Sequence, residues 1–241
     1  MGIVGDFERH GETESAEAFS KQNSKLLKVR LDHGPIKAKR GSMVAYQGDV
    51  KFSHAGSGGL KKFFKQAATG EGVKLMDVEG TGEVFLADRA TEVEVLYLQD
   101  DSLSVNGSNI LAFSAALQWD VERVGSGVAG VVAGGLFNVT LRGTGHVAIT
   151  SDGPPVVFDV SKGDVFADPQ AVVCWTSGVK MDIKADVNLK ALIGRGSGET
   201  FQMAFSGQGY VMVQPSEGVL FGTGGPPQET GGKGILGSLS G

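Results

Sequence analysis

The chain has 241 residues, enough for one large domain or two small ones with a substantial core. Hydrophobic residues make up 41% and charged residues 20%, which excludes a chain that is disordered or fibrous along its whole length. The net charge of −5 argues against bulk electrostatic capture of nucleic acid, and a single cysteine excludes an intramolecular disulfide framework.

The N-terminal segment, 1–24, is acidic over its first 20 residues and has no continuous apolar stretch. It has neither the apolar region of a secretory signal nor the arginine-rich composition of a mitochondrial transit peptide. The least polar stretch, 128–139, is 12 residues long and falls short of the roughly 20 needed to span a bilayer. These features predict a soluble protein in the reducing cytoplasm.

Two sequence frames then recur three times in the same order. One frame places alternating apolar residues on both sides of a Gly-x-Gly pair, and these pairs are Gly80 and Gly82, Gly143 and Gly145, and Gly207 and Gly209. The other frame runs from an apolar-x-apolar start to a small residue followed by an aromatic one, over 36–46, 103–113 and 165–175. Two frames repeated in one order indicate three copies of one unit.

The period of two inside each frame is that of strands with one buried and one exposed face. Glycine allows a positive φ or a close backbone approach, so each Gly-x-Gly pair is interpreted as a structural turn or bulge between two strands. The 38 glycines of the chain fit many such turns. We therefore predict an all-β fold, in which three units that share one core surround a pseudo-threefold axis.

The predicted domain organisation has three parts. The single three-repeat β domain covers 25–218, with the N-terminal segment before it and a glycine-rich flexible tail, 219–241, after it. No linker composition divides the domain internally. Its repeats are expected at about 25–92, 93–155 and 156–218.

The first unit contains an interruption that predicts a short amphipathic helix over 58–69. Its apolar residues follow the i, i+3, i+4, i+7 spacing, and three lysines flank its two phenylalanines. The candidate interaction surface consists of Lys61, Lys62, Phe63, Phe64 and Lys65. We expect the phenylalanines to pack on the protein itself; the alternative is contact with a protein or an anionic membrane.

Two stretches carry a resemblance to a known family. They are Gly58-Gly-Leu-x-Lys-x-Phe with the following Thr-Gly-Glu71, and Gly194-Arg-Gly-Ser-Gly-Glu199 leading into 205–215. On these residues the chain resembles, over about 24–218, the Altered Inheritance of Mitochondria 24 family, a mitochondrial biogenesis family related to the tryptophan RNA-binding attenuation protein. The resemblance implies a β-sandwich of three attenuation-protein-like repeats about a pseudo-threefold axis. It offers no catalytic residues, and without a transit peptide the chain is similar to the prokaryotic members.

Two glycine motifs match nucleotide-binding patterns only on paper. Gly143-x-Gly145-x-x-Ala148 is followed by strand and turn residues, whereas a dinucleotide site needs a helix N-terminus at the pyrophosphate. The stretch 194–199 lacks the Gly-Lys-Ser/Thr ending of a phosphate-binding loop. Both motifs are interpreted as structural glycines.

His146 and Cys174 are the candidate reactive side chains. His146 occupies a position filled by Glu83 and Tyr210 in the other units, which predicts a solvated imidazole. Cys174 precedes Trp175 in an apolar strand, which predicts a buried and inert thiol. We therefore predict no catalytic, cofactor-binding or metal-ligating residues, no cofactor and no enzyme activity.

The leading functional hypothesis is a non-enzymatic binding or scaffold protein that acts through its β surface, by binding a protein partner or by self-association. Peripheral contact with an anionic membrane is a second route, and no small-molecule substrate is identified. The alternative function is RNA binding, by analogy with the attenuation-protein fold and from seven basic residues within 21–40. The negative net charge and the few aromatic residues weigh against nucleic acid as a partner.

Overall fold

The computed structural model describes residues 9–54, 73–123, 137–185 and 201–216. Within these ranges the chain forms fifteen β-strands and two 3-10 turns, η1 (Leu31–His33) and η2 (Val160–Lys162). The prediction of an all-β chain is confirmed. The helix predicted over 58–69 lies outside the described residues.

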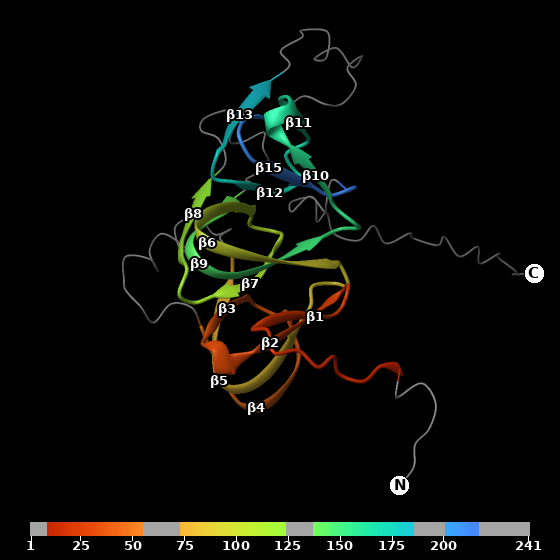
Figure 1. Ribbon diagram of the computed structural model, residues 1–241, viewed down its shortest axis with the longest axis vertical. Coiled ribbons are helices and arrows are strands. Elements are labelled where there is room, and N and C mark those ends of the chain that lie inside the picture. Colours follow the sequence, from red (N-terminus) through yellow and green to blue (C-terminus); the bar gives the residue numbers. More distant parts are fainter. Residues whose placement is uncertain (1–8, 55–72, 124–136, 186–200, 217–241) are drawn as a thin grey trace, which may run out of the picture.

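The strands fall into three consecutive groups, which we call the first (19–86), second (92–151) and third (156–213) units; Figure 1 shows them stacked along the long axis of the molecule. The first unit contains β1 (Phe19–Asn23), β2 (Leu26–Arg30), β3 (Ile36–Lys39), β4 (Met43–His54) and β5 (Leu75–Leu86). The second contains β6 (Glu92–Asn106), β7 (Ile110–Ser114), β8 (Gln118–Arg123) and β9 (Phe137–Ser151). The third contains β10 (Val156–Asp159), β11 (Val165–Ala167), β12 (Val172–Thr176), β13 (Val179–Ala185), β14 (Phe201–Gly207) and β15 (Tyr210–Val213).

One twelve-stranded sheet runs through all three units. Its order is β1-β2-β5-β3-β7-β9-β6-β12-β15-β10, with β4 paired to β5 and β8 paired to β9; β11-β14-β13 form a second sheet. Pairing of β3 with β7 joins the first unit to the second, and pairing of β6 with β12 joins the second to the third. Both junctions are antiparallel.

The register of pairing is the same inside each unit. The aromatic residue that ends the second frame faces the second residue after the Gly-x-Gly pair, as Tyr46 with Val84, Phe113 with Val147, and Trp175 with Val211. The first residue of the same frame faces the residue two positions before the Gly-x-Gly pair: Ile36 with Val78, Leu103 with Leu141, and Val165 with Phe205. The sequence frames therefore occupy matching positions in the three units, while the pseudo-threefold axis stays a prediction.

The two junctions also share one register. At the first junction Lys37 faces Phe113, and at the second Ser104 faces Trp175. Lys37 and Ser104 are each the second residue of their frame, and Phe113 and Trp175 are each the last residue of theirs. A closed threefold arrangement would need the same pairing between β11 and β4. Among the described strands β11 pairs with β14 and β4 with β5, and Figure 1 places β4 and β11 toward opposite ends of the molecule.

The hydrophobic core crosses the junctions. One buried cluster combines first-unit residues such as Val29 and Leu86 with Leu111 and Ala148 of the second unit. A second cluster centred on the middle unit includes Cys174 of the third. Each fully buried aliphatic or phenylalanine side chain stabilises the fold by roughly 1.5–3 kcal/mol, so the junctions carry a substantial share of the stability.

The Gly-x-Gly pairs differ from their predicted role. Only the third pair, Gly207 and Gly209, separates two strands, β14 and β15; the other four glycines, Gly80, Gly82, Gly143 and Gly145, lie inside β5 and β9. These four glycines therefore do not mark turns between strands, because both strands continue through them. The bulge alternative fits the second unit, where the pairing of β6 with β9 shifts register between Leu98 and Asp101, opposite Gly145 and Gly143. Gly80 has a φ of +125°, and a Cβ there would collide with the carbonyl oxygen of Asp49 on β4. Gly143 has a φ of +116°, so glycine is favoured at both positions.

Candidate functional site

The candidate surface predicted at 61–65 can be placed only in the sequence. Lys61, Lys62, Phe63, Phe64 and Lys65 all lie outside the described residues. Their predicted contact with a protein or a membrane stays a prediction. Within the described ranges, no helix has the length and apolar character needed to cross a bilayer.

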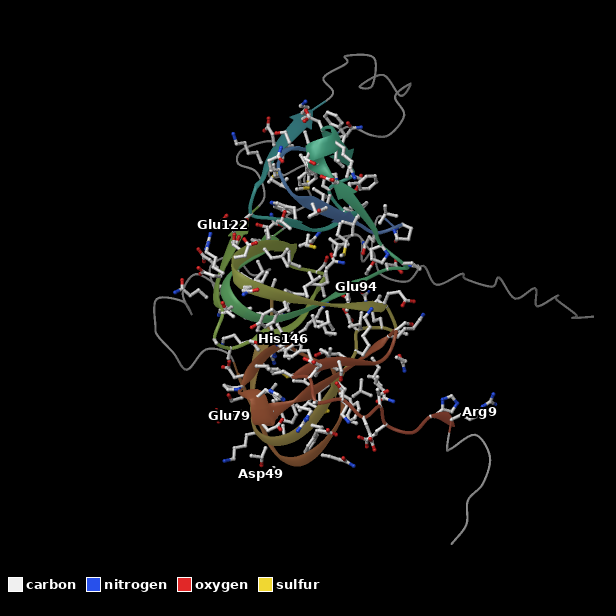
Figure 2. All side chains as sticks on the ribbon, viewed as in Figure 1. Arg9, Asp49, Glu79, Glu94, Glu122 and His146 are labelled. Atoms are coloured by element: carbon white, nitrogen blue, oxygen red, sulfur yellow. The ribbon has the colours of Figure 1, made fainter. Side chains whose placement is uncertain are left out.

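The basic stretch 21–40 is largely neutralised by ion pairs. The pairs are Lys21 with Glu94, Lys25 with Glu92, Lys28 with Glu12 and Glu83, Arg30 with Asp32, Lys37 with Asp77, and Lys39 with Asp88. Figure 2 shows Glu94 beside the junction of the first two units. A nucleic-acid surface presents unpaired positive charge to phosphates, and this stretch instead alternates both signs.

Lys28 illustrates the structural role of these pairs. Only 4% of the residue is exposed, and its Nζ lies 2.9 Å from Glu83 on β5 and 3.2 Å from Glu12. Burial lowers the pKa of Lys28, but hydrogen bonds to the two carboxylates raise it by more, so the pKa lies above its ordinary value. The ammonium group therefore stays charged and holds β2 against β5.

His146 is not the solvated side chain that the sequence predicts. Its ring stacks on Phe19 at a centroid distance of 5.3 Å and contacts the ring of Tyr97 at 4.8 Å. Burial lowers the pKa of His146, the charge of His33 lowers it further, and Glu17 opposes both. The prediction fails because β1 lies outside the repeated frames and brings Phe19 onto this position. In Figure 2 His146 lies at the meeting of the first and second units.

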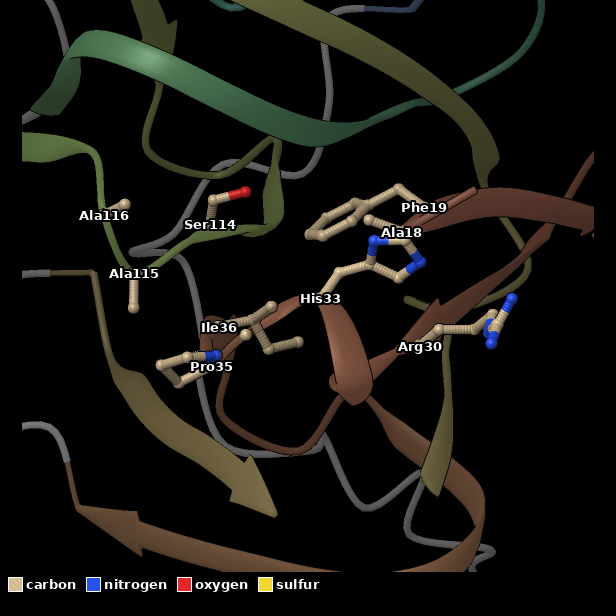
Figure 3. Close-up of a pocket in the computed structure, with 10 residues that line it drawn as sticks. Ala18, Phe19, Arg30, His33, Pro35, Ile36, Ser114, Ala115 and Ala116 are labelled. Carbon is tan, nitrogen blue, oxygen red and sulfur yellow. The ribbon is translucent and has the colours of Figure 1, made fainter. Parts of the chain in front are cut away.

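A cavity of about 350 Å³ lies beside Phe19. Figure 3 shows Phe19, His33, Ile36 and Arg30 around it. Arg30 donates to Asp32 at 2.6 Å, and Ser114, also in the wall, accepts the backbone N–H of His146 at 3.0 Å. The cavity therefore offers apolar contact beside polar groups already engaged in the fold.

Cys174 is buried as predicted. It is 4% exposed, and burial raises the pKa of its thiol to about 12, so at neutral pH it is protonated and a poor nucleophile. In the part of the chain that the structure describes, no group of three His, Cys, Asp or Glu side chains could hold a metal ion.

Most of the exposed apolar side chains lie on β4, β10 and β11, which are strands at the margins of the two sheets. The third unit exposes Val156, Val157 and Phe158 on β10 by 55%, 53% and 42%. Side chains alternate between the faces of a strand, so three consecutive exposed residues mean that both faces of β10 are open. In the sheet order β10 is the last strand, and among the described strands it pairs with β15 alone. This open strand is the candidate binding site.

The same position in the first unit is covered. Val29 and Phe158 are equivalent because they face Val84 and Val211 in matching register. Val29 is fully buried, since β1 pairs with the other edge of β2 and places Phe19 opposite it. Strand β10 is thus an open counterpart of β2.

Comparison with known proteins places the chain in a family. A family model described as Mitochondrial biogenesis AIM24 matches residues 18–216. The chain belongs to this family. The match confirms the resemblance found in the sequence, and it begins at β1, so that strand is part of the matched region. No curated protein matches the chain.

One solved structure supports the fold of this AIM24 protein. A crystal structure of a Streptococcus pyogenes protein matches with a TM-score of 0.64 and 24% identity, covering 82% of this chain and 92% of that chain. At this identity the likeness shows the fold alone. The family match and the structure leave the binding surface to be argued from the residues themselves.

Sequence reasoning did not identify β10 of this AIM24 protein as a surface. The predicted third repeat, 156–218, contains Val156, Val157 and Phe158 without giving them a role. The available signal was three apolar residues in a row directly after two prolines, where alternating faces cannot bury all three on one side.

Proposed function

We propose that this AIM24-family protein is a non-enzymatic, cytoplasmic binding or scaffold protein, and that it binds protein partners and further copies of itself through open strand edges. The observation that carries the proposal is β10, a margin strand with exposed apolar side chains on both faces. Such edges are the sites at which an extended segment adds a strand to a sheet.

The protein already contains one strand added to a sheet edge in this way. Strand β1 lies antiparallel on β2, with Phe19 opposite Val29, Ser20 opposite Lys28, and Lys21 opposite Leu27. In matching register, a partner segment on β10 would place an apolar residue opposite Phe158. Main-chain hydrogen bonds would supply affinity, and the apolar contact would select the segment.

The expected affinity is moderate. Burying one exposed valine or phenylalanine contributes roughly 1.5–3 kcal/mol, and ordering a free segment opposes much of that gain. A short segment is therefore expected to bind with a Kd of about 10–100 µM. A scaffold that combines several such contacts gains through multivalency.

The repeat architecture forms part of the proposal. We infer that the three units are attenuation-protein-like repeats, and the common register of their strands supports this. No observation on the described residues favours the RNA-binding alternative, because the basic stretch 21–40 is engaged in ion pairs. Contact with a membrane depends on 61–65 and is tested separately below.

The test uses the full chain and a fluorescently labelled peptide with the sequence of residues 17–24, which contains β1. We expect saturable binding by anisotropy, at least tenfold weaker for Phe158→Asp. The matched control is Tyr97→Asp, which alters a 57% exposed residue on β6, a strand away from the open edges, and should leave peptide binding unchanged. Equal binding by Phe158→Asp and the wild type would overturn the β10 site.

Two further probes separate the other functions. Single-stranded RNA at low salt and vesicles with anionic lipid are titrated against the same protein. We expect neither to bind. Salt-dependent RNA binding would favour the RNA function, and vesicle binding lost on the double change Phe63→Ser and Phe64→Ser would favour membrane contact.

A further inference from the structure

The junctions between units show what each unit requires of its neighbour. At the first junction β3, where the second frame of the first unit begins, pairs with β7, where the second frame of the second unit ends. At the second junction β6 pairs with β12 in the same way. Strands β7 and β12, which receive this pairing, have the same burial pattern: four buried residues and one half-buried residue. The strands that receive the preceding unit are thus buried along their length.

In the part of the chain that the structure describes, no unit precedes the first. Positions 43–47 of β4 are equivalent to β7 and β12, yet every one of these residues is exposed. Tyr46 is 49% exposed, whereas its equivalents Phe113 and Trp175 are 0% and 7% exposed. In the described part of the chain, β4 pairs with β5 alone.

The third unit has an open strand edge of the complementary kind, on β11. Its β11 is equivalent to β3 and to the end of β6, each of which pairs on both edges. The pairing described for β11 is with β14, on one edge. Phe166 at its centre is 50% exposed, and one face of its ring carries the Lys184 ammonium at 4.7 Å from the centroid.

We propose that copies of this protein associate head to tail, with β11 of one copy pairing antiparallel with β4 of the next. The register of the two internal junctions fixes the contacts: Val165 opposite Gln47, Phe166 opposite Tyr46, and Ala167 opposite Ala45. The inference deepens the self-association in the proposed function by naming its two surfaces, and it uses edges other than β10.

Physical complementarity supports this pairing. Among the described strands, each of the two edges lacks a second partner, and the register brings two half-exposed aromatic rings opposite each other, an arrangement that stabilises neighbouring strands. The contact is heterologous, since different surfaces of the two copies meet, so it extends into a filament or closes into a ring. The third unit of one copy would then pair with the first unit of the next copy in the way that the second unit pairs with the third inside one chain.

Crosslinking between variants that each carry one added cysteine tests the register. Tyr46→Cys and Phe166→Cys proteins are mixed and treated with a short bismaleimide; buried Cys174 does not compete. We expect at least tenfold more mixed dimer than from Tyr46→Cys with Tyr210→Cys, a control pair in which Tyr210 is similarly exposed at 54%. Yields equal to the control would overturn the proposal. So would crosslinking confined within single chains that carry both Tyr46→Cys and Phe166→Cys, because that result means intramolecular closure.

Charge exchange separates this contact from the β10 site. Sedimentation velocity should show concentration-dependent assembly of the wild type, lost in Phe166→Asp and in Tyr46→Lys, and restored when these two variants are mixed. The two variants and their mixture should keep the wild-type melting temperature at low concentration. Phe158→Asp should assemble as the wild type does. Assembly lost in Phe158→Asp but kept in Phe166→Asp would assign self-association to β10 and overturn the head-to-tail pairing.

Discussion

The inner junctions and the two outer strands of this protein contain equivalent residues in opposite environments. Phe113 and Trp175 are buried on strands that pair with the preceding unit, whereas Tyr46 is half exposed on β4, which among the described strands pairs with β5 alone. Strands β2 and β10 form a second such pair, one covered by β1 and the other open. The comparison shows that equivalent residues of a repeated fold differ in burial together with the strands that lie beside them.

The largest expected effect contrasts the two environments directly. Phe113→Ala removes a fully buried ring at a junction and should lower the free energy of unfolding by about 3–5 kcal/mol. Tyr46→Ala removes an exposed ring and should change it by no more than about 0.5 kcal/mol at low protein concentration. Urea unfolding of both variants measures the difference. Similar losses would show that Tyr46 is packed within the single chain.

A smaller effect compares the glycines of the end unit and the middle unit. Gly80→Ala forces a Cβ against the carbonyl of Asp49 in addition to straining a positive φ. Gly143→Ala strains a positive φ, but its Cβ would meet Leu117 at an ordinary 3.7 Å. We expect a loss of about 1 kcal/mol for Gly143→Ala and a larger loss for Gly80→Ala, measured by thermal and urea unfolding. The reverse order would show that β4 yields easily at Asp49.

The smallest effect is a pH dependence at the first junction. The pKa of His146 is lowered in the folded protein because of burial, so protonation favours the unfolded state. The neutral ring contributes stability above its ordinary pKa of about 6.5, and this contribution is lost as pH falls below it. Between about pH 7.5 and about pH 5, His146→Gln should lose less stability than the wild type.

Urea unfolding at both pH values measures the change, with His10→Gln, an exposed histidine, as the control. Equal pH dependence of His146→Gln and the wild type would show that the stack with Phe19 and Tyr97 leaves the titration of His146 unchanged.

The sequence was sufficient for the features that repeat. Alternating frames predicted strands, and the structure pairs those frames in one register. The sequence was insufficient where an element outside the repeated frames packs on only one unit. Strand β1 has no counterpart in the frames, so neither the burial of Val29 nor the stacking of His146 could be deduced from them.

The candidate surface was missed for the same reason. The apolar residues of β10 have the composition of a buried strand, and their exposure depends on which strands lie beside them. Similarly, the pattern around Gly80 and Gly143 indicates that the backbone needs glycine there. It does not distinguish a bend within one strand from a turn between two, because both use positive φ.

The chain order of the junctions bears on how the protein is built during synthesis. Strand β3 is complete at residue 39, but its second edge is filled only when β7 emerges, and the end of β6 waits in the same way for β12. Each unit that has folded during synthesis thus offers an open strand edge on which the next unit pairs. We therefore expect the units to fold in order from the N-terminus. Strand β11 is the equivalent edge of the third unit, and among the described strands it pairs with β14 alone.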